Sequence, residues 1–100
     1  IKQAEIRWTG EQVNLVELIY GLYYTGQINH ANVEVKDILA LVERVFDIKI
    51  KAAYHVFGNI RRRKNISPTA FLDKMREAII KRVDDDLAYH PHKDKLRNRL

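Results

Sequence analysis

The chain has 100 residues, of which 46% are apolar and 31% are charged, and its formal net charge is +5. This length suits one domain with a modest core, and the apolar share argues against an intrinsically disordered chain. The absence of cysteine excludes disulfides and thiolate metal sites, and no apolar run reaches the roughly 20 residues that a membrane helix needs.

The first predicted helix follows a short strand. The strand is predicted at residues 4–8, and Thr9 then has capping-box spacing to Gln12. We expect the helix to run from there to about Tyr24, with Gly26 as the left-handed residue that ends it. Its buried face consists of apolar residues at helical spacing: Leu15, Leu18, Ile19 and Leu22. Residues 33–35 are predicted as a second short strand that pairs with the first.

Two further helices are predicted over residues 37–46 and 51–63, joined by a turn at 47–50. Apolar residues of the third helix recur at i, i+3, i+4 and i+7, which places on a core-facing stripe Ala53, Val56, Phe57 and Ile60. Solvent would then meet the polar residues opposite: Lys51, His55, Asn59, Arg62 and Arg63. Many DNA-binding proteins have this order of a helix, a tight turn and an exposed basic helix, and they place the second helix in the DNA major groove.

A fourth helix is predicted after a break, with Ser67 as N-cap and Pro68 as its first residue. We expect it to end near residues 84–86, three aspartates that the helix dipole disfavours at a C-terminus. The predicted fold is therefore mainly α, a helix-turn-helix or winged-helix-like domain of about four helices with at most a small two-stranded β ribbon. It would span residues 1–88 and be followed by a basic tail at 89–100. Since the chain opens with Ile1, we also expect an upstream domain.

Residues 49–64 carry six lysines and arginines and no acid. The four consecutive cations at residues 61–64 repel one another, and a bound polyanion relieves that repulsion. Lys and Arg contacts to phosphate supply most non-specific DNA affinity, whereas Lys, Arg and Asn can also read base edges. We predict base-edge contacts by Lys51, His55, Asn59 and Arg62. Phosphate contacts are predicted for Lys49, Arg61, Arg63 and Lys64.

Other constellations are weaker. Tyr20, Tyr23 and Tyr24 are interpreted as core residues rather than as platforms for unpaired bases. His90 and His92 with Asp94 offer too few ligands for a metal site. No spacing indicates catalysis, so we expect no enzyme, no cofactor, no metal, no membrane and no small-molecule substrate. The sequence allows a homodimer without defining its surface. Two alternatives stay open: a protein-interaction module whose basic helix binds an acidic partner, and an RNA or single-strand binder.

An ordered series of short words resembles the RteC family, regulators associated with mobile conjugative elements of gut Bacteroidetes. The words are WTG at residues 8–10, LVELIY at 15–20, Asn29, VFDI at 45–48, Tyr54, Phe57, IR at 60–61, RK at 63–64 and TAFLD at 69–73. The resemblance implies a cytoplasmic, DNA-binding transcription regulator of excision genes. It also implies that this region is a winged-helix-like carboxyl-terminal domain with a separate domain before it.

Overall fold

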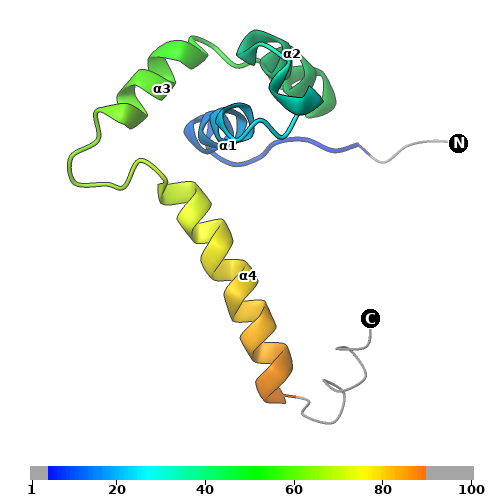
Figure 1. Ribbon diagram of the computed structural model, residues 1–100, viewed down its shortest axis with the longest axis vertical. Helices are drawn as coiled ribbons and strands as arrows, with labels where there is room; N and C mark the ends of the chain where they lie inside the picture. The colour runs from blue at the N-terminus through cyan, green and yellow to red at the C-terminus, as the bar shows by residue number, and fades with distance from the viewer. Residues whose placement is uncertain (1–4, 90–100) are drawn as a thin grey trace, which may run out of the picture. The chain divides into compact units, whose positions relative to one another are not determined.

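The computed structural model describes residues 5–89, and the regular secondary structure of these residues is all helical (Figure 1). Its elements in chain order are α1 (Gln12–Tyr24), the 3-10 helix η1 (Asn29–Ala31), α2 (Val35–Val45), α3 (Ala53–Arg61) and α4 (Ala70–Tyr89). The prediction of a mainly α fold with four helices is confirmed. The two predicted strands are wrong, because residues 5–8 and 33–34 form no strand and residue 35 already begins α2.

The chain divides into two compact units, residues 1–69 and residues 70–100, and each is described by itself. The first unit contains α1, α2 and α3, and the second contains α4. The single domain predicted for residues 1–88 remains a prediction.

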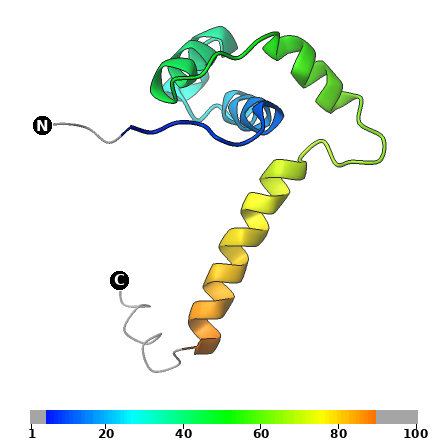
Figure 2. The same ribbon diagram turned by 180° about the vertical axis from the view of Figure 1, so that it is seen from behind.

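Helix α1 is the centre of the first unit, because it packs against both α2 and α3 (Figures 1 and 2). On one side, Val16 and Tyr20 form a buried cluster with Ala53 and Ile60 of α3. Neighbouring residues of a helix diverge by about 100°, so a second side of α1 can bury its own apolar row. The apolar stripe predicted for α3 is thereby confirmed as the contact with α1.

The second side of α1 packs against α2. Leu15 and Ile19 are both 0% exposed and form a buried cluster with Ile38 of α2. Trp8 and Phe46 border this cluster, with their rings edge-on and the centroids 5.9 Å apart. The buried face predicted for the first helix is correct at Leu15 and Ile19.

Helix α1 begins later than the capping signal predicts. Thr9 is not its N-cap: the N-cap is Glu11, which has extended backbone and no side-chain cap, and the helix begins at Gln12. The indole Nε1–H of Trp8 donates a hydrogen bond to the Glu11 carbonyl at 3.0 Å. This bond and the packing of Trp8 hold the residues before Gln12 out of the helix.

The end of α1 is the one that the sequence predicts. Gly26 has a φ of +68°, the left-handed region that glycine enters without steric cost. Its N–H donates to the Tyr23 carbonyl at 3.1 Å, and the Gln27 N–H donates to the Leu22 carbonyl at 3.3 Å. These two bonds are the Schellman arrangement, which satisfies carbonyls left open by the last turn.

Substituting Gly26→Ala is expected to lower the free energy of unfolding by about 1 kcal/mol, since a Cβ disfavours the left-handed region. The same position after α2 is held by Asp47, with a φ of 49° and an Ile48 N–H bond to the Glu43 carbonyl at 3.0 Å. Asp47→Gly should therefore shift stability in the opposite direction. Urea unfolding followed by circular dichroism measures both, and equal signs for the two variants would contradict this account.

Helix α3 is shorter than predicted at both ends. Ala52 adopts a left-handed conformation with a φ of 52°, so the helix begins at Ala53 and Lys51 lies before it. Arg62 is the C-cap residue, so the helix ends at Arg61 instead of residue 63. The turn predicted at 47–50 is accordingly a longer connection over residues 46–52. It nevertheless separates α2 and α3, which run in different directions (Figure 1).

In the second unit, α4 begins at Ala70, two residues after the predicted start. The Ser67 hydroxyl just before it accepts a hydrogen bond from the Thr69 N–H at 3.1 Å, as an N-cap side chain does. The predicted end near residues 84–86 is wrong, because α4 continues to Tyr89. Lys81 pairs with Asp85 at 2.6 Å and Arg82 with Asp86 at 3.4 Å, so i,i+4 ion pairs offset the unfavourable dipole.

Within residues 5–89, no helix combines the length and apolar character that crossing a membrane requires. The histidines at 90 and 92 and the aspartate at 94 lie outside the described residues.

Candidate nucleic-acid interface

Four polar residues follow one another along the side of α3 opposite its apolar stripe. His55 and Asn59 lie on the helix, Lys51 precedes it and Arg62 caps it, and all four are exposed. We call these four residues the α3 outer face. The prediction that they meet solvent is confirmed. Residues 48–72 contain no aspartate or glutamate, so no acid close in sequence neutralises the cations of the α3 outer face.

The connection before α3 is held by side chains of the other two helices. The Gln12 side-chain amide of α1 donates to the Lys49 carbonyl at 2.8 Å. The Glu43 carboxylate of α2 accepts a hydrogen bond from the Ile50 N–H, also at 2.8 Å. Both bonds are made by the peptide group that joins Lys49 to Ile50, so they fix the backbone between Lys49 and Lys51. Both lysines are exposed.

Asn59 and Arg62 act together. The Arg62 Nη2 donates to the Asn59 Oδ1 at 2.8 Å. Glycine at position 58 leaves room for this guanidinium, since a Cβ there would lie 3.3 Å from Arg62 Nη1. One lone pair of Oδ1 is thereby used, and the pair offers solvent the N–H donors of Asn59 Nδ2 and of the guanidinium together with the second lone pair of Oδ1. Such a pair suits acceptors, which include phosphate oxygens and the O6 and N7 atoms of guanine.

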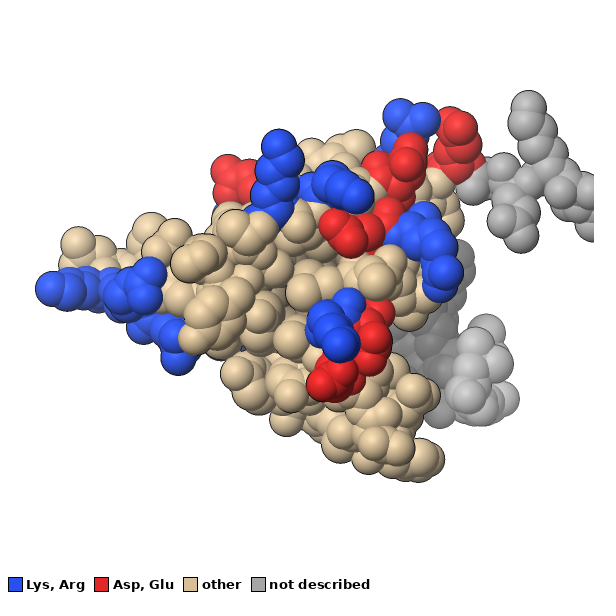
Figure 3. Space-filling view, turned by 90° about the horizontal axis from the view of Figure 1, so that it is seen from above, with Lys and Arg blue, Asp and Glu red and all other residues tan. Residues whose placement is uncertain are grey.

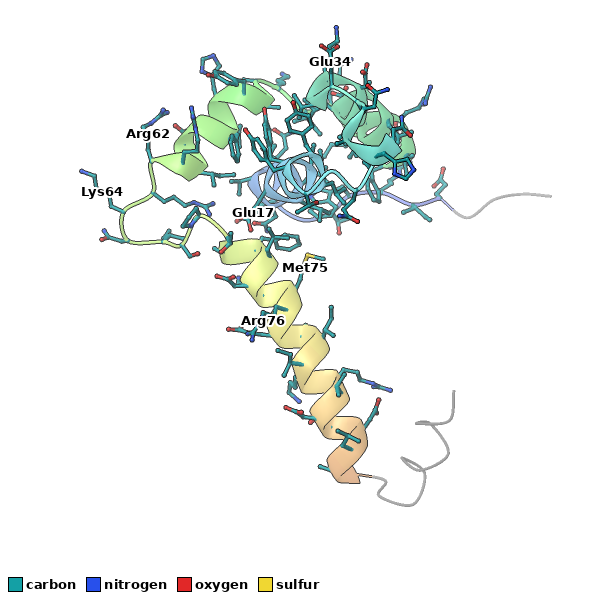
Figure 4. All side chains as sticks on the ribbon, viewed as in Figure 1. Glu17, Glu34, Arg62, Lys64, Met75 and Arg76 are labelled. Atoms are coloured by element: carbon teal, nitrogen blue, oxygen red, sulfur yellow. The ribbon has the colours of Figure 1, made fainter. Side chains whose placement is uncertain are left out.

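The remaining exposed cations of this region surround the end of α3. The Arg61 guanidinium carbon lies 5.8 Å from the centre of the Phe57 ring, within cation–π range. Lys64 is exposed in the loop after α3, near Arg62 in sequence and projecting outward with it (Figure 4). Figure 3 shows a group of Lys and Arg side chains at the end of the first unit where this loop lies.

Arg63 is placed differently from the other cations. Its side chain is 18% exposed, and its Nη1 lies 3.5 Å from the Oε1 of Glu17, which is 4% exposed on α1. The same nitrogen donates to the Ser67 carbonyl at 2.9 Å. The prediction that Arg63 faces solvent is therefore wrong: a buried carboxylate holds it inside the first unit, where it ties the loop of residues 62–67 to α1.

Comparison with known protein families shows the family of the chain. The family model described as RteC protein matches residues 1–86. The chain belongs to the RteC family. The resemblance found in the sequence is thus confirmed over most of its length. Searches of curated proteins and of solved structures gave no match.

In this RteC family member, the Glu17–Arg63 pair is expected to stabilise the folded state. Arg63→Met removes one partner and leaves a buried carboxylate, so the free energy of unfolding should fall by about 2 to 3 kcal/mol. Arg62→Met removes the same charge from an exposed position and should cost about 0.5 kcal/mol or less. Urea unfolding of the two variants measures the difference. Equal losses would show that Arg63 does not hold the loop.

The tyrosines of this RteC chain divide between core and surface. Tyr20 is buried, and its ring stacks on Phe57 with the centroids 4.0 Å apart, so its interpretation as a core residue is confirmed. Burial raises the pKa of the Tyr20 hydroxyl, and the neighbouring Tyr24 and Tyr54 add to that rise. Tyr23 is half-buried, whereas Tyr24 is 68% exposed.

Tyr54 is a candidate site residue that reasoning from the sequence missed. Its side chain is 69% exposed, beside His55 with the ring centroids 6.1 Å apart. The available signal was its spacing of i, i+3 and i+7 with Phe57 and Arg61, which makes an aromatic and cationic row along one edge of α3. Among the described residues, no group of three His, Asp or Glu side chains gathers as a metal ion would require.

Proposed function

We propose that this RteC family member is a cytoplasmic, DNA-binding transcription regulator that controls excision and transfer genes of a mobile conjugative element. The observation that carries the proposal is the α3 outer face. It places donors and cations on an exposed helix that α1 supports from behind. Family membership supports the regulatory setting, because the RteC resemblance implies regulators of such elements.

The mechanism is docking without chemistry, so no catalytic residue, cofactor or metal is assigned. Helix α2, the connection over residues 46–52 and α3 form the docking unit, with α3 entering the major groove. Phosphate contacts set the register of the protein on the duplex, and base-edge contacts set the sequence preference. The base-edge residues are those of the α3 outer face, and the phosphate residues are Lys49, Arg61 and Lys64. Arg63 acts indirectly, by holding the loop that carries Lys64.

The Asn59–Arg62 pair is expected to determine which base the protein prefers at one position of the duplex. A free asparagine side chain reads adenine with one donor and one acceptor, whereas arginine reads guanine with two donors. Arg62 occupies one of the two lone pairs of Asn59 Oδ1, and the guanidinium contributes most of the donors of the pair, so guanine is the base that the pair is expected to contact. The operator is therefore expected to carry a guanine opposite this part of α3.

Two observations each support an alternative function. The basic loop end of α3 also suits an acidic protein partner. The exposed rings of Tyr24 and Tyr54 suit stacking with unpaired bases. Both are weaker proposals than duplex binding, because neither uses the outer face, with its paired Asn59 and Arg62.

The test is a mobility-shift titration of the chain against a pool of random-sequence duplexes at two salt concentrations. Duplex docking predicts a retained complex, enrichment of one guanine-containing motif, and affinity that falls steeply as salt rises. A complex with single strands but not with duplexes would support the tyrosine alternative. No complex with either nucleic acid would contradict the proposal.

A further inference from the structure

Helix α3 contains a glycine, Gly58, within its length. Glycine destabilises a helix interior relative to alanine, because it has more backbone freedom to lose on folding. Gly58 is nevertheless buried. A Cβ built on it would have three atoms of one group as its nearest neighbours outside the adjoining residues. They belong to the Arg62 guanidinium, with Nη1 at 3.3 Å, Nη2 at 3.5 Å and Cζ at 3.7 Å. The guanidinium of Arg62 therefore lies against the open backbone of Gly58.

Backbone and side chain both hold Arg62 in this position. Its N–H donates to the Gly58 carbonyl at 3.2 Å, so Arg62 lies one turn beyond the glycine. Helical side chains lean toward the N-terminus, which returns the Arg62 side chain over Gly58, and its Nη2 bonds to Asn59 Oδ1 at 2.8 Å. Non-bonded carbon atoms prefer separations of roughly 3.5–4.0 Å. A Cβ 3.3 Å from Nη1 would therefore push the guanidinium outward, away from its place beside Asn59.

We propose that Gly58 is a positioning residue that sets base preference, because it lets the Arg62 guanidinium lie in one arrangement on α3 before DNA is bound. The inference rests on the proposed function, in which Arg62 contacts a guanine. A long side chain loses rotamer freedom when it binds, and one that is already ordered loses less. Ordering one such side chain in advance is equivalent to about twofold to tenfold in affinity. Gly58 thus lowers helix stability and raises the preference for guanine.

Gly58→Ala is expected to have two effects of opposite sign. The Tm should rise by about 2 to 6 °C, because alanine favours the helix. The guanine preference should fall by about twofold to tenfold. This preference is the ratio of affinities for the selected duplex and for the same duplex with that guanine replaced by adenine, both measured by mobility shift at one salt concentration. Gly58→Leu, with a larger side chain, should reduce the preference at least as much. Gly21→Ala, the matched control within α1, should leave it unchanged.

Two further measurements separate positioning from a merely structural role. In chains that already carry Arg62→Ala, adding Gly58→Ala should change the guanine preference no further. In the free protein, nitrogen-15 NMR should show slower rotation of the Arg62 guanidinium in the natural chain than in Gly58→Ala.

Three results would overturn the inference: a fall in Tm on Gly58→Ala, equal guanidinium rotation in both chains, or an unchanged guanine preference. A natural chain that binds no duplex would contradict the proposed function and this inference with it. A natural chain with a guanine preference that Gly58→Ala leaves unchanged would overturn this inference alone.

Discussion

Leu15→Ala is expected to lower the free energy of unfolding by about 3 to 4 kcal/mol, because it removes a fully enclosed side chain and leaves a cavity. Leu15 is 0% exposed and lies in the cluster in which α1 packs against Ile38 of α2. The total stability of a small domain is roughly 5 to 15 kcal/mol, so this loss is a large share of it. Urea unfolding monitored by circular dichroism gives the value directly.

Leu41→Ala is the matched control, since it makes the same chemical change on α2 at a side chain that is 44% exposed. Its cost should be about 1 kcal/mol or less, because little surface is removed from contact with other residues. If both variants lost the same stability, α1 would not be the centre of the core.

Arg62→Ala is expected to weaken binding to the preferred duplex by about tenfold to a hundredfold, the usual value of one good base-edge contact. The variant removes the guanidinium that α3 holds through Asn59 at 2.8 Å. It should also reduce the preference for guanine at one position of the operator, which a random-pool selection would reveal. Binding is measured by mobility shift at one fixed salt concentration.

Arg44→Ala controls for net charge, because Arg44 is an exposed cation on α2, outside the α3 outer face. Removing it should change duplex affinity by about threefold or less, through long-range electrostatics alone. A similar loss for both variants would mean that the chain binds DNA by overall charge, without a docked helix. An unchanged affinity for Arg62→Ala would remove Arg62 from the site.

Periodicity predicted the parts of the fold that depend on burial. The four helices, the apolar stripe of α3 and the burial of Leu15 and Ile19 follow from apolar spacing, which the core enforces. Gly26 was predictable because few other residues adopt its backbone conformation. For the candidate site, the same periodicity predicted which side of α3 faces solvent, since that side is opposite the stripe.

The remaining details depend on contacts between residues distant in sequence or on local backbone. Ala52 has no sequence signal for a left-handed conformation, yet it decides that Lys51 lies before α3. Glu17 lies on α1 and Arg63 in the loop after α3. Only the packing of α1 against α3 brings the Arg63 Nη1 to 3.5 Å from the Glu17 Oε1. A charge in the otherwise apolar run at residues 15–20 was the one hint of that pair.

The most direct test of the account is a titration of the isotope-labelled chain with the selected duplex, followed by amide chemical shifts. The account predicts that the largest changes fall on residues 49–64, with His55, Asn59 and Arg62 among them, while the start of α1 changes little. Changes centred on Tyr23 and Tyr24 at the end of α1, or confined to α4, would show that the α3 outer face is not the surface that binds DNA.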